Sequence, residues 1–565
     1  MGNCLTNSFS SAKEAKALPV DTIFKFPSPL PNWASGEGFA SGTIDLGGLQ
    51  VCQISSFTKI WATHEGGPNN LGATFFEPSA VPKGFSMLGC YSQPNNQPLF
   101  GWVLVGKDIT VDSSSGGTLK KPIDYTLIWS SESSNFEQDD HGYIWSPTPP
   151  DGYKAVGHVV TTSPEKPSLD KIRCVRSDLT DECEAGRWIW GEGTTSSENG
   201  FNVYGSRPSI RGTKAQGVCV GTFTAQDNTS GTAPNSSLAC LKNNNFTLFS
   251  TMPKANQIEA LVQTYSPWMY FHPREEYLPS SVDWFFSDGA LLYKKGEESN
   301  PVHIEPTGSN LPQGGSNDGE YWLDLPIDHK AREEVMKGDI KTSATYLHVK
   351  PVFGGTFSDI VVWIFYPFNG PSTAKLGLID KPLGKIGEHV GDWEHVTFRV
   401  SNFNGVLHNV YFSQHSGGTW VDAPLLEFQN GTNKFVAYSS LHGHANYPKP
   451  GLVLQGISGI GIRNDTAKSD LVMDAGARYS IVAAEHIAGI VEPPWLNYAR
   501  KWGPKITYEL GKEIENVENV LSGELKSALE YLVNILPDEV YGEDGPTGSA
   551  DVFSVLLLAE VVQPF

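Results

Sequence analysis

The sequence predicts a mainly β protein built from two unlike halves. Gly (58) and Pro (38) are abundant among its 565 residues, while only 18% of the residues are charged. Abundant turn residues with few charges favour many short strands over long helices. A hydrophobic fraction of 39% is enough for packed cores and excludes a disordered chain. The length predicts more than one domain.

Charge, Cys and His all divide the chain near residue 250. The formal net charge is −21, of which residues 1–250 carry −5 and the remainder −16. All seven Cys precede residue 250, and eleven of the 14 His follow it. The acidity excludes a general nucleic-acid binder and disfavours attraction to anionic lipids. We expect four regions: an acylated flexible N-terminus at 1–20, a repeat domain at 21–250, a domain with the candidate site at 251–503, and a helical region at 504–565.

The N-terminus carries an acylation pattern. Met1-Gly2-Asn3-Cys4-Leu5-Thr6 matches Met-Gly-x-x-x-Ser/Thr, in which the glycine receives myristate after Met removal. Cys4 stands where palmitate is often added, and two acyl chains together hold a protein at a membrane. We therefore predict attachment through Gly2 and Cys4 to the cytoplasmic face of the plasma membrane or an endomembrane. The alternative is a short disordered tail with a chance match.

The first half repeats a short pattern. Residues 76–89 and 145–157 both read aromatic-x-Pro, then Pro-x-Gly-aromatic, and end in an aliphatic residue and Gly. Looser copies cover 26–42 and 204–221. Each unit predicts an extended entry set by Pro, a Gly turn and a short strand. Repeats of this length indicate a repeated β architecture.

The second repeat carries a family resemblance. Trp145 to Gly157, followed by Lys166-Pro-Ser-Leu-Asp-Lys-Ile-Arg-Cys-Val-Arg176, resembles a plant family similar to vacuolar protein sorting-associated protein 62. The repeat is also similar to the β-prism units of membrane-associated trafficking proteins. The resemblance implies a β-prism-like first half that approaches membranes, but it supplies no activity.

Polar residues of the second half gather after a predicted buried strand. The apolar run from Ile360 to Phe368 predicts a fully buried strand, and we expect Pro367 to end it. Alternation after it places Asp392 and Glu394 on one face, and Trp393 and His395 on the other, with His389 just before the strand. Two carboxylates and an imidazole suit Ca²⁺, Mg²⁺, Mn²⁺ or Zn²⁺. Alternatively, one carboxylate is a general base, or Asp392 ends a turn and Glu394 pairs with an Arg such as Arg399.

A second polar cluster follows at His442-Gly443-His444-Ala445-Asn446-Tyr447. The His-x-His spacing places both imidazoles on one face of an extended chain, as in many metal chelates. The alternative is a turn with imidazoles bonded to backbone. We therefore predict five metal ligands: His389, Asp392, Glu394, His442 and His444. Four further residues are predicted to bind the ligand: Trp393, His395, Asn446 and Tyr447.

The same segment resembles a second family. Phe365-Tyr366-Pro367 and then His389-x-Gly-Asp392-Trp393-Glu394 are similar to a strand and motif of necrosis-inducing toxins. That resemblance implies a β-sandwich that binds a divalent cation and sphingolipid headgroups, with His389, Asp392 and Glu394 as ligands. The toxin motif has a second His directly before the Asp, where this chain has Gly391.

Three functions are consistent with these patterns. The first is a monomeric, non-enzymatic peripheral membrane protein that binds a polar lipid headgroup or glycan through a divalent cation. The second is a metal-dependent hydrolase or lyase with Glu394 or His442 as base. The third is a scaffold or defence protein with a vestigial site. Apolar residues at helical spacing in 505–536 also predict a few helices that pack on the sandwich.

Overall fold

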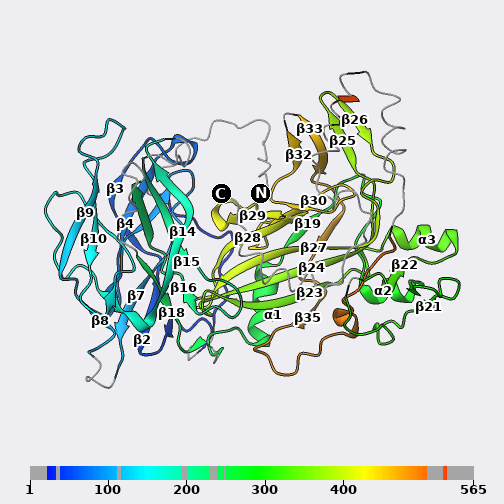
Figure 1. Ribbon diagram of the computed structural model, residues 1–565, viewed down its shortest axis with the longest axis horizontal. Coiled ribbons are helices and arrows are strands. Elements are labelled where there is room, and N and C mark those ends of the chain that lie inside the picture. Colours follow the sequence, from blue (N-terminus) through cyan, green and yellow to red (C-terminus); the bar gives the residue numbers. More distant parts are fainter. Residues whose placement is uncertain are drawn as a thin grey trace.

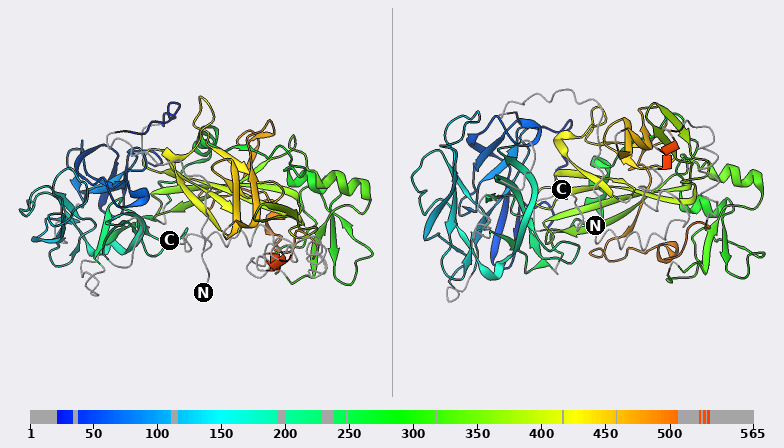
Figure 2. Two further views of the ribbon diagram at one scale, coloured as in Figure 1. Left: turned by 90° about the horizontal axis from the view of Figure 1, so that it is seen from above. Right: turned by 45° about the horizontal axis from the view of Figure 1, so that its top comes forward.

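Two groups of β-sheets lie side by side along the long axis of the molecule (Figures 1 and 2). This computed structural model describes residues 22–33, 38–110, 116–193, 200–227, 238–246, 249–316, 318–415, 417–457 and 459–505, and a few residues between 523 and 530. Among the described strands, those at 43–242 pair only with one another, as do those at 268–483. The predicted mainly β class, with a β-prism-like half and a β-sandwich half, is confirmed.

Five small sheets form the first half. In the order of pairing they are β1 (Thr43–Asp45), β2 (Leu49–Ile54), β7 (Val103–Asp108) and β5 (Ser86–Met87); β12 (Val159–Thr161), β10 (Tyr143–Thr148) and β9 (Asp124–Ser130); β11 (Tyr153–Lys154), β13 (Cys174–Arg176) and β8 (Leu119–Lys120); β16 (Gly217–Val218), β18 (Ala239–Lys242), β14 (Thr180–Gly191), β15 (Phe201–Pro208) and β17 (Phe223–Asp227); and β3 (Phe57–Ala62), β4 (Ala73–Pro78) and β6 (Tyr91–Pro94).

The repeat glycines meet where the repeats adjoin. A Cβ added to Gly157 would lie 2.8 Å from the Cα of Gly89, and one added to Gly89 would lie 2.7 Å from the Cα of Gly157. The Cγ2 of Thr222, which follows the 204–221 copy, is 2.8 Å from both added Cβ positions. The repeats also bond to each other there, since Cys90 N–H donates to the His158 carbonyl at 2.9 Å. The repeats therefore end in Gly because two backbones approach too closely for a side chain.

The first predicted repeat departs from this arrangement. Phe26 lies against Phe428 and Tyr265 of the second half, with ring centroids 5.9 and 6.1 Å apart. Ser28 N–H donates to the Asn433 Oδ1 at 2.8 Å. The segment 22–33 therefore packs on the sandwich, because its aromatic residues complete the sandwich core.

The second half is a sandwich with additional layers. Its six-stranded sheet has the order β29 (Gly417–Asp422), β28 (Leu407–Gln414), β27 (His389–Ser401), β24 (Phe357–Asn369), β23 (Thr345–Val352) and β35 (Tyr479–Ala483). A four-stranded sheet covers one face, with the order β31 (Asn446–Tyr447), β30 (Val436–Ser439), β19 (Trp268–Tyr270) and β34 (Val472–Asp474). The remaining elements are a second four-stranded sheet of β26 (Ile379–Pro382), β25 (Thr373–Leu376), β33 (Ile460–Thr466) and β32 (Gly451–Ile457), a small sheet of β21 (Val302–His303), β20 (Leu291–Lys294) and β22 (Tyr321–Asp324), and the helices α1 (Ala255–Tyr265), α2 (Val282–Ser287) and α3 (His329–Met336).

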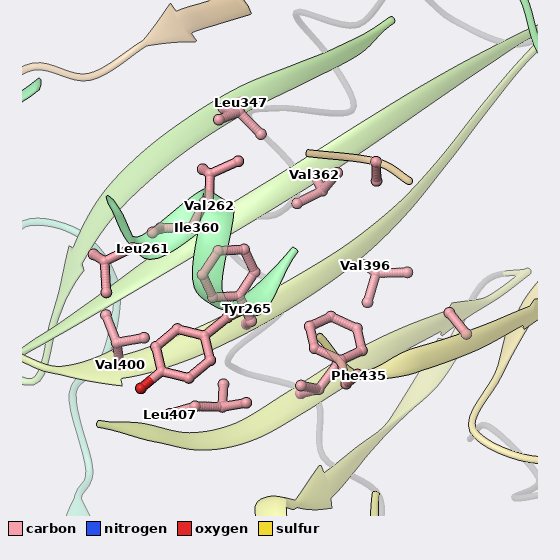
Figure 3. Packing of buried hydrophobic residues seen from close by; sticks show 14 of the residues in the cluster. Leu261, Val262, Tyr265, Leu347, Ile360, Val362, Val396, Val400, Leu407 and Phe435 are labelled. Carbon is pink, nitrogen blue, oxygen red and sulfur yellow. The ribbon is translucent and has the colours of Figure 1, made fainter. Parts of the chain in front are cut away.

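The central strand β24 is apolar on both faces from Ile360 to Phe368. In β24, Ile360 and Val362 face a core that also contains Leu261 and Tyr265 of α1 (Figure 3). Val361 and Trp363 of the same strand face a second core, shared with α2 and residues 495–502. Burial on both faces explains why β24 is an uninterrupted apolar run.

The predicted end of this strand was wrong. β24 continues past Pro367 to Asn369, and Phe368 pairs with Val390 of β27. Pro367 has no N–H to donate, and the register has no partner for it between the Tyr366–Asp392 and Phe368–Val390 pairs. The neighbouring pairs hold the strand across this gap, so β24 reaches His389.

Several predictions lie outside the described residues. These are the acylated N-terminus with Gly2 and Cys4, and nearly all of the helical region at 504–565. No helix in the described part of the chain is long and apolar enough to cross a membrane.

Candidate functional site

Polar residues of both sandwich sheets converge at one end of the core. Asp392 and Glu394 extend from β27, and Asn446 from β31 of the covering sheet. His444 precedes β31, and Glu275 follows β19. We call these five residues the His444 site. All five are buried, so the molecule holds charged groups in a place that otherwise favours apolar side chains.

His444 lies at the centre of this site. Its Nδ1 is 2.9 Å from the Asp392 Oδ2, and its Nε2 is 3.0 Å from the Tyr277 carbonyl and 3.9 Å from the Glu275 Oε1. Its ring stacks on Tyr366 with centroids 3.8 Å apart. Burial alone would lower the pKa of His444, but Asp392 and Glu275 outweigh burial and raise it to about 9. His444 is therefore a buried imidazolium at neutral pH.

The carboxylates of the site differ in charge. Burial would raise the pKa of Asp392 and of Glu275, but the hydrogen bonds and charge of His444 hold both below their ordinary values. Burial and then repulsion by Asp392 raise the pKa of Glu394 to about 8. Glu394 is therefore mainly a neutral acid at pH 7, and the Ser413 hydroxyl lies 2.5 Å from its Oε2. Two negative groups against one positive group leave the site acidic.

Three of the nine non-glycine residues with positive φ in the described part of the chain lie around the site. His415, His442 and His444 have φ of 54°, 68° and 53°, a left-handed region that non-glycine residues rarely adopt. Each such residue costs of order 1–3 kcal/mol, and strain of this kind collects where function requires it.

Unpaired polar atoms are found in the same place. Asn446 Oδ1, Ser440 Oγ and Asn464 Nδ2 are buried and have no hydrogen-bond partner among the described residues. Asn464 is tied to the site rim, because its Oδ1 bonds the His415 Nε2 at 2.9 Å. A buried polar atom without a partner costs about 1–3 kcal/mol. The site therefore offers an unused acceptor and an unused donor to a ligand.

The comparison with known families places the whole chain. The sequence pattern of the family described as vacuolar protein sorting-associated protein 62 matches residues 20–552. The chain belongs to this family. The vacuolar protein sorting-associated protein 62 of Saccharomyces cerevisiae is 28% identical over 173 residues, which cover 27% of this chain and 35% of the relative. The chain thus spans about a third of the length of that relative.

Solved structures resemble part of this Vps62-family chain. GNIP1Aa from Chromobacterium piscinae is 22% identical, with 35% of this chain and 38% of that chain covered and a TM-score of 0.28. Necrosis and Ethylene inducing Protein 2 from the causal agent of cocoa's Witches Broom disease is 12% identical, with 34% and 67% covered and a TM-score of 0.19. NLPPya in complex with glucosamine is 13% identical, with 35% and 68% covered and a TM-score of 0.18.

The predicted site residues of this Vps62-family chain separate into two groups. Asp392, Glu394, His444 and Asn446 converge as described, and Tyr447 is buried beside them on β31. Trp393 and His395 lie on the opposite face of β27: Trp393 belongs to the second core, and His395 lies 4.6 Å from Trp363. The alternation was predicted, but it turns these two rings away from the site.

The predicted five-ligand metal site is not assembled. His442 lies at the rim, with its Nδ1 3.1 Å from the Pro371 carbonyl, and His389 Nδ1 is 2.8 Å from the Gly391 carbonyl. Both ring nitrogens of His444 already have partners. Within the described ranges, no three His, Cys, Asp or Glu side chains are grouped to hold a metal ion. The residues as placed do not fit a cation held by all five, because His444 itself supplies the positive charge between the carboxylates. The divalent cation stays a prediction.

Glu275 and Ser413 were missed by sequence reasoning. Glu275 follows an aromatic-rich strand, and its Oε2 accepts from the His442 backbone N–H at 2.6 Å. It stands beside Glu276 in an aromatic segment, but nothing local distinguishes it from a surface Glu. Only the parallel pairing of β19 with β30 brings it to His444.

Proposed function

We propose that this chain is a non-enzymatic, peripheral membrane protein that binds the sugar part of a lipid headgroup or glycan at the His444 site. The observation that carries the proposal is the coincidence of three strained His residues with unpaired buried polar atoms. Strain and unsatisfied groups both cost stability, so their coincidence beside buried charges supports a ligand that repays them. The N-terminal acylation pattern supports the membrane part of the proposal.

The chemistry of the site favours a hydroxyl-rich ligand over an anionic one. Asp392 and Glu275 are ionised acceptors, and Asn446 Oδ1 is a further unused acceptor. Phosphate or sulfate would be repelled by this acidic group, whereas sugar hydroxyls and the ammonium of an amino sugar can donate to it. Asn464 Nδ2 can donate to a ring or hydroxyl oxygen. We therefore assign a neutral sugar or an amino sugar as the ligand class.

Calorimetric titration of the purified full chain tests this assignment. The probes are glucose, glucosamine and mannosamine, and vesicles of phosphatidylcholine with and without glucosylceramide. We expect saturable binding of at least one sugar form. Binding of free sugars identifies a glycan ligand, and binding only of the glucosylceramide vesicles identifies a lipid headgroup. Absence of binding to every probe would refute the proposal.

Two site variants and one control make the test specific. Asp392→Asn keeps the side-chain shape but removes the charge, and a hydrogen bond to a charged group is worth about 1.5–3 kcal/mol, so affinity should fall roughly 10- to 100-fold. His415→Asn changes only the exposed rim, and Asn tolerates the left-handed backbone of His415. Asp151→Asn, in an exposed turn of the first half, should bind like the parent. Equal affinity of all four proteins would contradict the proposed site.

A further inference from the structure

Two hairpins project together from the edge of the sandwich beside the His444 site. β25 and β26 form one hairpin, β32 and β33 form the other, and β25 pairs with β33. The turns are bonded to each other, since Gly377 N–H donates to the Gly459 carbonyl at 3.2 Å. Figure 1 shows the four strands rising side by side. We call them the hairpin sheet.

The far end of the hairpin sheet is apolar and exposed. Leu378, in the turn between β25 and β26, is 100% exposed, and the adjacent Ile379 is 39% exposed. Ile460 begins β33 at the same end and is half-buried. A single exposed Leu needs no explanation, but consecutive apolar residues at the tip of a projecting sheet indicate an interaction site.

The hairpin sheet and the residues at its base carry a net positive charge. Residues 373–386 contain three Lys and one Asp, and residues 449–468 contain two Lys, one Arg and one Asp, so each segment carries +2 in a chain of −21. Asp380 and Asp465 are paired with Arg463 at 2.5 and 2.6 Å. Lys381, Lys385 and Lys449 have no ion-pair partner among the described residues, and Lys385 and Lys449 are exposed. The hairpin sheet is therefore a local cationic region on an acidic protein.

The dimensions decide which side chains can reach a membrane interface. β32 has seven residues and β26 has four, so their lengths are about 23 and 13 Å at ~3.3 Å per residue. The headgroup layer on each side of a bilayer is about 5–8 Å thick. When the apolar tip reaches the acyl chains, Lys381, two residues from Ile379, is therefore at the level of the headgroups, whereas Lys385 and Lys449 lie above them. Such a narrow convex tip is too small for a protein partner, because stable interfaces bury at least ~1,000 Å².

We propose that the hairpin sheet docks this protein on an anionic lipid bilayer, with Leu378 and Ile379 entering the acyl region and Lys381 facing the headgroups. The rest of the acidic surface does not prevent this contact, because charges more than about 10 Å away are screened at 0.1 M salt. The inference goes beyond the proposed function, since it needs neither acyl chains nor a sugar. It also orients the His444 site towards the membrane, because Leu441 N–H donates to the Asp465 carbonyl of β33 at 2.9 Å.

Vesicle flotation tests the inference in a Gly2→Ala full chain, which cannot be myristoylated. The vesicles contain phosphatidylcholine and phosphatidylserine at 7:3, without sugar lipids, and phosphatidylcholine alone serves as reference. We expect binding to the anionic vesicles that weakens as salt rises from 0.1 to 0.5 M. Absence of binding to the anionic vesicles, or equal binding to both vesicle types, would overturn the inference.

Matched variants locate the contact. Leu378→Asp with Ile379→Asp should weaken binding at least tenfold, because both apolar side chains lose their burial among the acyl chains. Lys381→Glu should weaken it and reduce its salt dependence. The control, Ile327→Asp with Val491→Asp, changes residues that are 71% and 84% exposed elsewhere and should bind like the parent. Unchanged binding of the tip variant, an equal loss in the control, or a tip effect only on self-association would overturn the inference.

The two proposals fail separately. The tip variant should keep its calorimetric affinity for free sugars, and Asp392→Asn should keep its affinity for sugar-free anionic vesicles. Loss of both activities in either variant, with an unchanged melting temperature, would contradict the separation of the two sites.

Discussion

The imidazolium of His444 makes the strongest stability prediction. A pKa raised from 6.5 to about 9 corresponds to roughly 2.5 pKa units, or about 3 kcal/mol at ~1.36 kcal/mol per unit. Because the folded pKa lies above the unfolded one, this stability is fully present below pH 6.5 and is lost as pH rises through about 9. His444→Asn removes the charge, and Asn tolerates the left-handed φ of 53° at this position. The variant should cost about 3–5 kcal/mol at pH 6, since two buried carboxylates lose their counter-ion.

Urea unfolding at pH 6 and pH 9.5, followed by Trp fluorescence, checks this prediction. The stability difference between parent and His444→Asn should be about 3 kcal/mol smaller at pH 9.5 than at pH 6. Glu394 also changes the stability with pH: because its pKa is raised, it destabilises the fold as pH rises from 4.5 to about 8. This change occurs in both parent and variant, so much of it cancels in their difference.

His158→Asn supplies the matched control for a buried His. Burial lowers the pKa of His158 to about 4, so this ring is neutral in the folded chain but takes up a proton in the unfolded chain near pH 6; the parent–variant difference should therefore be about 1 kcal/mol larger at pH 9.5 than at pH 6, opposite in sign to that of His444. A parent–variant difference for His444→Asn that is the same at pH 6 and pH 9.5 would refute the buried imidazolium.

Three further predictions concern the scaffold and the N-terminus. Asp359→Ala leaves the buried Arg399, now bonded at 2.7 and 2.8 Å, without its carboxylate, and should lower the free energy of unfolding by about 3–5 kcal/mol in the same urea assay; a cost under about 1 kcal/mol would contradict this. Gly157→Ala should lower the free energy of unfolding by about 1–3 kcal/mol, because the added Cβ would lie 2.8 Å from the Cα of Gly89. The control Gly417→Ala, whose added Cβ would have its nearest atom at 3.9 Å, should be neutral. Equal melting temperatures of the two variants would disprove the close approach. Gly2→Ala should move the protein from the membrane to the soluble fraction of lysed eukaryotic cells in part, with the hairpin tip variant removing the remainder; an unchanged distribution of both would exclude the two routes.

Local patterns predicted the class of the fold and parts of the site. The Gly and Pro content and the small fraction of charged residues were sufficient for a mainly β protein. The repeat glycines Gly89 and Gly157 identified positions that only the smallest residue can occupy. Strand alternation placed Asp392 and Glu394 on one face, because side chains of a strand alternate whatever the strand packs against. Each of these properties depends on neighbours in the sequence.

The tertiary structure decided which residues meet. Asp392 lies 52 residues from His444, and Tyr277 lies 167 residues from it, so no local pattern reveals that they are bonded. The same alternation that exposes Asp392 to the site turns Trp393 into the second core, and only the covering sheet determines which face is the site. A net charge of −21 disfavours an anionic membrane, yet β25 and β33 bring two cationic segments together in one projecting sheet. Composition is a sum over the whole chain, whereas electrostatic contact acts over about 10 Å, so folding alone creates the local charge.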